Sequence, residues 1–240
     1  MRKLGAITQR ELLSLFCSPI AYIVIAGFWL VTGAITIWNA DAFGPGKPAT
    51  LRDIFMWTPF ILTIVIPAMS MRTLSEEYRS GTFETLMTAP ISDAQMVFGK
   101  YLASLVFYVI MIGGTLIYPL LMEVFGNPDW GEVFALYLGL LLLGISFTAF
   151  SMFASSLTKD QAVAWILGAL PLMLLVLSVY SLVRRFEGWQ REFVQQINIM
   201  GRFGQFARGQ VELDGIVFFL ATAALFLFLT VKVVESRRWR

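Results

Sequence analysis

Long apolar stretches alternate with short polar intervals along the chain of 240 residues. About 20 apolar residues, at a rise of 1.5 Å per residue, cross the roughly 30 Å hydrocarbon layer of a bilayer. The pattern therefore predicts an all-α membrane protein, organised as one membrane domain over residues 1–240. We expect six transmembrane helices, at about residues 20–38, 54–71, 95–122, 133–155, 161–182 and 215–234.

The first 18 residues are more polar than the spans and predict an amphipathic helix that lies in the membrane interface. Ser18-Pro19 should end this helix, because proline disfavours the α conformation in the residue before it and suits the start of the next helix. A polar extension of the first span is the alternative. The apolar face of the interface helix is expected to carry Leu4, Ile7, Leu12, Leu15 and Phe16.

Local signals mark several of the expected spans. Pro59 and Pro67 should kink the second span and leave backbone carbonyls that a partner must satisfy. Ser92 and Gln95 have the spacing of a capping box, which predicts a helix start at Ser92.

Small and aromatic residues inside the spans allow two interpretations each. Small residues follow one face of the fourth span, which favours close helix packing over a substrate-lining role; they are Gly144, Thr148, Ser151 and Ser155. Four aromatic residues are expected to face lipid, or else to line an apolar path; they are Phe28, Trp29, Tyr108 and Tyr118.

Six spans would put both termini on one side of the membrane. That side then carries eleven lysines and arginines, Lys100 among them, and the opposite side carries seven. The positive-inside rule places the termini and the loop 72–92 in the cytoplasm, with the reversed topology as the alternative. The opposite loop, 184–214, has apolar residues at helical spacing and predicts an amphipathic helix in the outer headgroups, with Trp189 at the interface.

The composition excludes several kinds of chemistry. Hydrophobic residues make up 58% and charged residues 14% of the chain, which contains no histidine and one cysteine, Cys17. Zinc sites built from His or Cys, Ser-His-Asp triads and histidine proton relays are thereby excluded. No phosphate-binding loop is present, and no ionisable residue lies at the centre of an expected span. We therefore expect no catalytic residue, metal or directly bound cofactor.

The cytoplasmic loop 72–92 is the segment most suited to binding a protein. Gly81 and Thr82 should start a helix of about two turns that Pro90 ends. Its apolar face would present Phe83, Leu86 and Met87. Glutamates surround this face, whereas helices that lie on lipid usually carry lysines and arginines, so a groove in a soluble partner is favoured over lipid headgroups.

The same loop carries a resemblance to a known family. Glu76-Glu77, the run from Arg79 to Leu86, the run from Ala89 to Ser92, and Gly99-Lys100 resemble the coupling-helix region of ABC-2 type transporter permeases. Further stretches resemble the permease associated with bacterial gliding motility: Phe16 to Tyr22, Phe206 to Gly209, Leu213-Asp214 and Arg237 to Trp239.

The resemblance implies a membrane-spanning subunit of an ATP-driven exporter with the type V exporter fold, in a bacterial cytoplasmic (inner) membrane. It further implies a second permease copy or paralogue, a separate ABC ATP-binding subunit that holds ATP and Mg²⁺, and in some relatives an auxiliary protein with a large extracytoplasmic domain. Nucleic acid is not an expected partner. The alternative function is a mechanical or scaffolding membrane component that passes ATP-driven motion to an extracytoplasmic partner without transport.

Two sets of residues are candidates for coupling to the ATPase. The expected interface with the ATP-binding subunit is the coupling helix, with Gly81, Thr82, Phe83, Glu84, Leu86 and Met87. The expected transmission network at the end of the second span is Arg72, Glu76, Glu77 and Arg79. For this second set, a solvated cluster of charges is the alternative.

Overall fold

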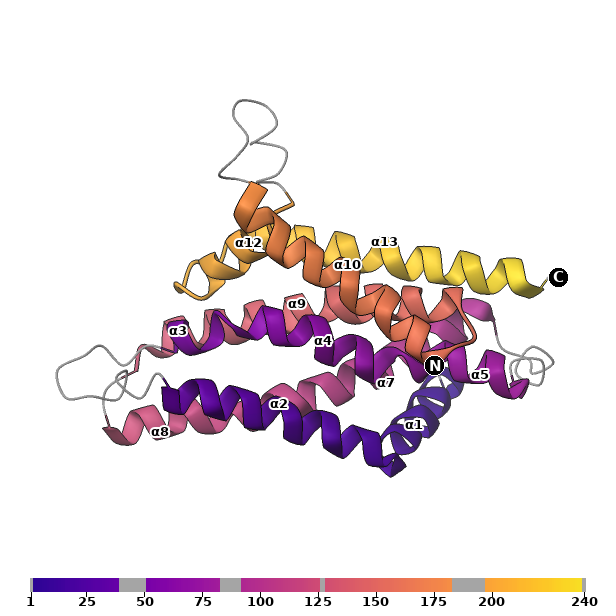
Figure 1. Cartoon of the computed structure of the whole chain (residues 1–240), viewed down its shortest axis with the longest axis horizontal. Coiled ribbons are helices and arrows are strands. Elements are labelled where there is room, and N and C mark those ends of the chain that lie inside the picture. The colour runs from indigo at the N-terminus through magenta and orange to yellow at the C-terminus, as the bar shows by residue number, and fades with distance from the viewer. Residues whose placement is uncertain (1, 39–50, 83–91, 126–127, 183–196, 239–240) are drawn as a thin grey trace.

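The computed structural model describes residues 2–38, 51–82, 92–125, 128–182 and 197–238, and all regular structure in this part of the chain is helical (Figure 1). The helices are α1 (Arg2–Cys17), α2 (Pro19–Trp38), α3 (Arg52–Phe55), α4 (Thr58–Ser70), α5 (Arg72–Ser80), α7 (Asp93–Gly113), the 3₁₀ turn η2 (Gly114–Leu116), α8 (Ile117–Phe125), α9 (Trp130–Leu157), α10 (Gln161–Leu182), α12 (Ile199–Phe206) and α13 (Leu213–Arg238).

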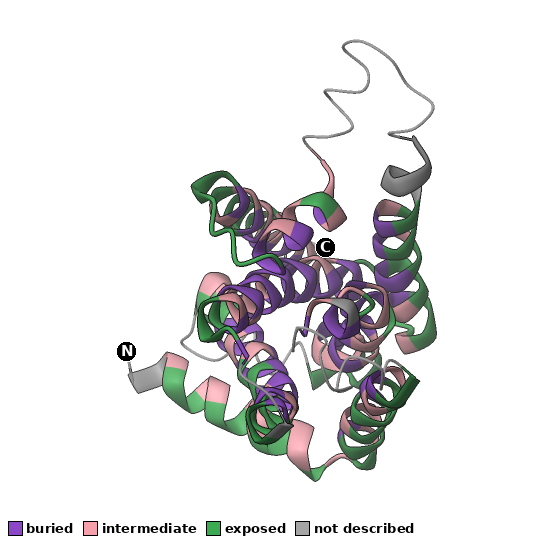
Figure 2. Cartoon of the chain, turned by 90° about the vertical axis from the view of Figure 1, so that its left-hand side faces the viewer, coloured by how far each residue is buried: buried purple, intermediate pink, exposed green. Residues whose placement is uncertain are grey.

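Helix α9 lies at the centre of the bundle and packs against α4, α5, α7, α10, α12 and α13. Buried residues gather toward the middle of the bundle, and exposed residues occupy its outer faces (Figure 2). The buried side chains on α9 include Leu140, Leu143 and Phe147. An outer surface that stays apolar, with Leu30, Phe134 and Phe228 exposed, is what a bundle surrounded by lipid requires.

Five helices in the described part are long and apolar enough to span a membrane. They are Pro19–Trp38, Thr58–Ser80, Asp93–Val124, Trp130–Leu157 and Leu213–Arg237. Helix α10 coincides with the fifth expected span, 161–182, but its apolar stretch Gln161–Leu177 is shorter than the other five. The count of six therefore stays a prediction, whereas the all-helical, multi-pass character is confirmed.

Two local signals have the effect expected of them. Helix α1 ends at Cys17 and α2 begins at Pro19, so Ser18-Pro19 does break the chain between helices. Gln95 N donates to Ser92 Oγ and Ser92 N donates to Gln95 Oε1, which forms the predicted capping box at the start of α7.

Only one of the two prolines lies where a kink was expected. Pro59 stands in the first turn of α4, after a break at Met56 and Trp57, so it starts a helix and does not bend one. Pro67 lies inside α4. The carbonyl of Ile64, in the turn before Pro67, accepts a hydrogen bond of 3.2 Å from Trp165 Nε1 on α10. The carbonyl that Pro67 leaves without an intrahelical donor is that of Thr63, one residue before this contact, so the expected partner for it stays a prediction.

The small face of α9 is buried, as the packing interpretation predicts. The ring of Tyr108 on α7 packs against Gly144, and its hydroxyl donates to the Leu140 carbonyl at 2.7 Å. Thr148, Ser151 and Ser155 are buried along the same face.

The expectation that the aromatic residues face lipid is wrong for Phe28 and Tyr108, which are buried. Trp29 is half exposed, but its Nε1 donates to the Met111 carbonyl at 2.9 Å. Tyr118 is partly buried, with its hydroxyl 3.1 Å from Thr32 Oγ1. The hydroxyl or indole N–H of Tyr108, Trp29 and Tyr118 meets a partner on a neighbouring helix, whereas Phe28 packs in the main core cluster.

The expectation for the loop 184–214 is also wrong where the structure describes it. Helix α12 does not lie on headgroups, because Ile199, Phe203 and Phe206 are buried in the main core cluster. Gly139 and Gly215 leave room for the Phe206 ring: a Cβ at either position would come within 3 Å of that side chain. Burial of Phe203 and Phe206 in the core removes their apolar surface from water and so stabilises this position of α12. Trp189 and Phe193 lie outside the described residues.

The contact between Gly144 and Tyr108 yields a stability prediction. A Cβ on Gly144 would lie 2.0 Å from the Tyr108 ring, which is fully buried and held by its hydrogen bond. Gly144→Ala should therefore lower the stability by about 1–3 kcal/mol, the usual cost of overpacking. Thermal unfolding in detergent, followed by intrinsic fluorescence, measures the change.

Gly27→Ala is the matched control, because a Cβ on Gly27 of α2 meets nothing within 4 Å. This variant should be as stable as wild type or slightly more stable, since alanine favours the helix. An unchanged melting temperature for Gly144→Ala would show that the packing around Tyr108 is loose.

Candidate functional site

Helix α5 leads from the bundle toward the predicted coupling segment. It follows α4 directly through Met71, and Gly81 ends it in the left-handed conformation, with φ of 74°. Glycine adopts this conformation without the strain that a side chain would cause. Leu74 and Tyr78 lie one turn apart on the buried face of α5, so packing fixes the direction in which the chain leaves the bundle.

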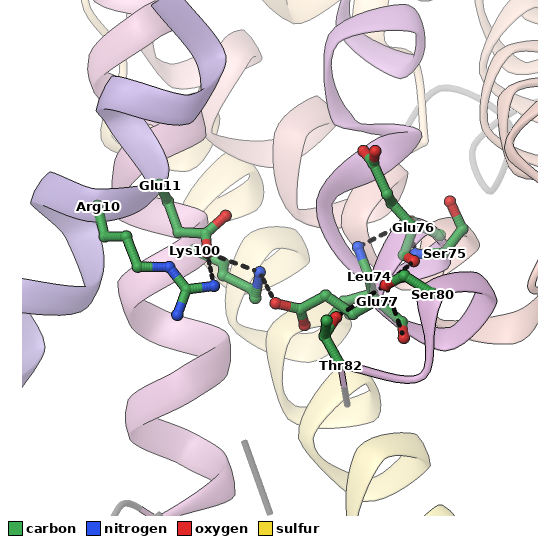
Figure 3. Close-up of polar contacts among 10 residues, drawn as sticks. Arg10, Glu11, Leu74, Ser75, Glu76, Glu77, Ser80, Thr82 and Lys100 are labelled. Atoms are coloured by element: carbon green, nitrogen blue, oxygen red, sulfur yellow. Dashed lines mark hydrogen bonds and ion pairs between the residues drawn. The ribbon is translucent and has the colours of Figure 1, made fainter. Parts of the chain in front are cut away.

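A buried ion-pair cluster joins α5 to α1 and α7 (Figure 3). Lys100 Nζ lies 2.7 Å from Glu77 Oε1 and 3.1 Å from Glu11 Oε1. Arg10 NH2 lies 3.6 Å from the same Glu11 oxygen. These four residues are named the Lys100 cluster.

The Lys100 cluster is deeply buried at its centre. Lys100 is 2% exposed and Glu77 is 7% exposed. Removing a charge from water costs several kcal/mol, and only opposite charges at close range offset that cost. Since one lysine and one arginine meet two carboxylates, the formal charges of the cluster sum to zero. Its three helices must therefore stay together for the charges to remain paired.

Further contacts dock α1 on α7 beside Lys100. Thr8 Oγ1 donates to the Gly99 carbonyl at 3.1 Å. Ile7 fits against Gly99, where a Cβ would lie 2.7 Å from the isoleucine side chain. Part of the apolar face of α1 thus packs against α7 and does not face lipid.

A second hub ties the start of α5 to α9. Ser155 Oγ donates to the Met71 carbonyl at 2.9 Å and accepts from the amides of Leu74 and Ser75, both at 3.2 Å. The first amides of a helix have no partner within the helix, so this hydroxyl acts as a cap supplied by another helix. Ser155 therefore holds the junction between α4 and α5 against the centre of the bundle.

A third contact comes from α13. The guanidinium of Arg237 lies 4.2 Å from the centre of the Tyr78 ring, and its NH2 donates to the Leu157 carbonyl at 2.9 Å. Arg237 thus bridges the end of α9 and the buried face of α5. Helix α5 is consequently held by α1, α7, α9 and α13 at once.

Comparison with known proteins then identifies the family. The family model for the ABC-2 family transporter protein matches residues 52–197, more than half of the chain. The chain belongs to this family. The matched segment includes α5, the Lys100 position and Ser155. A comparison with curated proteins gives no match.

Family membership makes the chain a permease component of an ABC transporter and implies an ATP-binding partner subunit. The family match does not distinguish subfamilies, so the resemblance to gliding-motility permeases stays a prediction.

The structure separates the predicted transmission residues of the permease into two groups. Glu77 is buried in the Lys100 cluster, and Arg72 NH1 donates to Ser18 Oγ at 3.0 Å, between α1 and α2. Glu76 and Arg79 are exposed, as the solvated-cluster interpretation expects.

Only the beginning of the predicted ATPase interface is described. Gly81 and Thr82 are exposed, and Ser80 Oγ lies 2.8 Å from Thr82 Oγ1. Phe83, Glu84, Leu86 and Met87 lie outside the described residues. In the described part, no group of three or more His, Cys, Asp or Glu side chains could hold a metal ion.

Sequence reasoning missed Lys100, Glu11 and Ser155 as members of the site. The signal for Lys100 was present, because a lysine that follows a marked helix start by eight positions faces an otherwise apolar span. An ionisable residue inside a span usually has a named partner within the bundle. The sequence could not identify that partner, since Glu11 lies 89 positions away.

Removing Lys100 should destabilise the permease strongly. Lys100→Met leaves Glu77 buried beside Glu11 without its cation, which typically costs about 3–5 kcal/mol. Replacing both carboxylates as well, with Glu77→Gln and Glu11→Gln, should recover a large part of this loss. Denaturation in detergent micelles measures both effects.

Lys232→Met serves as the control, because Lys232 pairs with Glu235 on an exposed face of α13. Surface pairs contribute little, so this variant should unfold close to wild type. If Lys100→Met were as stable as Lys232→Met, the Lys100 cluster would not hold the three helices.

Proposed function

We propose that the chain is the membrane-spanning subunit of an ATP-driven ABC-2 exporter, and that a separate ATP-binding subunit docks on residues 82–88. The observation that carries the proposal is the anchoring of α5. This helix is fixed to four other helices by buried contacts and leads through Gly81 directly into the segment that resembles a coupling helix.

The position of α5 in the bundle supports docking of a partner at one end. Helix α5, the start of α1 and the end of α13 all lie toward the same end of the bundle (Figure 1). The excess of lysine and arginine on the side of the termini supports a cytoplasmic position for this end, where ATP is available. ATP and Mg²⁺ would bind the partner subunit, so the permease itself is not the enzyme.

The contact with the ATPase is the first step of the mechanism. Phe83, Leu86 and Met87 form the apolar anchor in a groove of the partner, and Glu84 makes a charge-assisted hydrogen bond to a basic residue there. A few aromatic and aliphatic anchors typically carry most of the binding energy of such an interface.

The second step passes the motion of the ATPase into the bundle. When the coupling segment moves, α5 moves with it, because only Gly81 separates α5 from residues 82–88. Through Glu77 and Lys100 the displacement reaches α1 and α7, and through Ser155 it reaches α9. Buried, closely paired groups cannot separate gradually at low cost, so these helices shift together between discrete arrangements.

The third step opens a path between permease copies. A second copy of the chain, or a paralogue, would face the first across the membrane domain, and export follows from the resemblance to exporters of this family. An auxiliary protein with an extracytoplasmic domain would act on the opposite side of the bacterial inner membrane.

The proposal predicts the result of removing the anchor. The double variant Phe83→Ala with Glu84→Ala should insert normally but lose about 2 kcal/mol or more of binding to the ATP-binding subunit, as expected for a central anchor. Co-purification of the two subunits and ATP hydrolysis by the complex in proteoliposomes measure binding and coupling.

Val211→Ala with Glu212→Ala is the matched control. It also removes an apolar residue and the glutamate that follows it, but in an exposed stretch between α12 and α13. Co-purification and coupled hydrolysis that are equal in both double variants would overturn the assigned role of residues 82–88. ATP turnover by the intact complex without any flux would instead favour the mechanical function over export.

A further inference from the structure

A cavity of about 350 Å³ lies between α1, α2, α4, α5 and α7, next to the Lys100 cluster. Its polar wall includes Glu11, Ser18, Arg72, Glu76 and Lys100. The proposed coupling mechanism does not require a cavity beside Lys100.

The lining changes from charged or polar to apolar in the same direction along three walls of the cavity, formed by α4 with α5, by α7 and by α2. On α4 and α5, Arg72 is followed one turn deeper by Ala68. On α7, Lys100 is followed about two turns deeper by Phe107. On α2, Val24 lies deeper than Ser18 at the helix break. A cavity with a charged end at the rim of the bundle and an apolar end within it matches an amphiphile in a bilayer.

The charges that face the cavity are not all neutralised by each other. Lys100 and Glu11 belong to the Lys100 cluster. Arg72 and Glu76 lie one turn apart on α5, and no ion pair joins them among the described residues. Arg72 NH1 donates to Ser18 Oγ, while its buried Nε has no acceptor in the described structure. The cavity is thus lined by a guanidinium and, one turn away, by a carboxylate that is not paired with it.

We propose that this cavity binds the headgroup of a phospholipid that carries a phosphate and a primary ammonium group. The phosphate lies against Arg72, whose planar donors suit phosphate oxygens. The ammonium lies against Glu76 and donates hydrogen bonds to its carboxylate, which a trimethylated ammonium has no proton to do. The glycerol and the first chain carbons extend toward Val24, Ala68 and Phe107.

The size of the cavity agrees with a headgroup site. Ligand pockets range from about 300 to 1,000 Å³, and a cavity at the lower end of this range holds a headgroup while the acyl chains remain in the bilayer. The site goes beyond the proposed transport function, because it concerns a lipid bound by the permease alone.

Native mass spectrometry of the purified full-length chain tests the proposal. The probe is an equimolar mixture of phosphatidylethanolamine, phosphatidylcholine and phosphatidylglycerol with identical acyl chains. Wild type should retain phosphatidylethanolamine about tenfold over the other two lipids, the factor expected for one charge-assisted hydrogen bond. Glu76→Gln should abolish this preference and increase retention of phosphatidylglycerol. Arg72→Gln should reduce retention of all three lipids.

Arg79→Gln is the matched control, because Arg79 lies on the same helix and loses the same charge but does not line the cavity. It should retain lipids as wild type does. Equal retention of the three lipids by wild type, or an unchanged preference in Glu76→Gln, would overturn the proposal.

A second measurement needs no substitution. Cys17 lines the cavity and is the only cysteine of the chain. Phosphatidylethanolamine should slow its reaction with a water-soluble thiol reagent several-fold, whereas phosphatidylcholine should not. The same reaction rate with both lipids would contradict binding at this cavity.

Discussion

The ammonium group of Lys100 is buried among apolar helices, and carboxylates reach it from two directions. Glu77 comes from α5 and Glu11 from α1, at 2.7 Å and 3.1 Å. Because unpaired charge is so costly in such surroundings, the two helices cannot be displaced from α7 independently. Helices α1, α5 and α7 are thereby held together as one unit, and the proposed function depends on that unit.

Several other polar contacts also join neighbouring helices. Ser155 caps the junction at Met71, and Trp165 satisfies a carbonyl near the inner proline. These contacts lie around α4, α5 and α9. A displacement of α5 would therefore strain the hydrogen bonds that join it to α9, the central helix. The proposed headgroup site shares Lys100 and Glu11 with the cluster. A bound lipid would therefore lie against the unit that carries the motion.

Features set by neighbouring residues could be predicted from the sequence, and features set by distant ones could not. The break at Ser18-Pro19 and the capping box at Ser92 depend on a few adjacent positions, and both are present. Burial of Tyr108 depends on a glycine 36 positions later, and burial of α12 depends on how its phenylalanines meet α9. Likewise, the sequence shows Lys100 as a cation but does not show that Glu77 and Glu11, on two different helices, lie beside it.

The proposed mechanism requires that α1, α5 and α7 form one unit through Lys100. Hydrogen exchange of the wild-type permease and of Lys100→Met, followed by mass spectrometry, tests this claim most directly, because exchange reports the stability of each segment separately. The account predicts faster exchange in α1 and α5 together, with no change in α12. Faster exchange confined to α7, or unchanged exchange in α1 and α5, would contradict it.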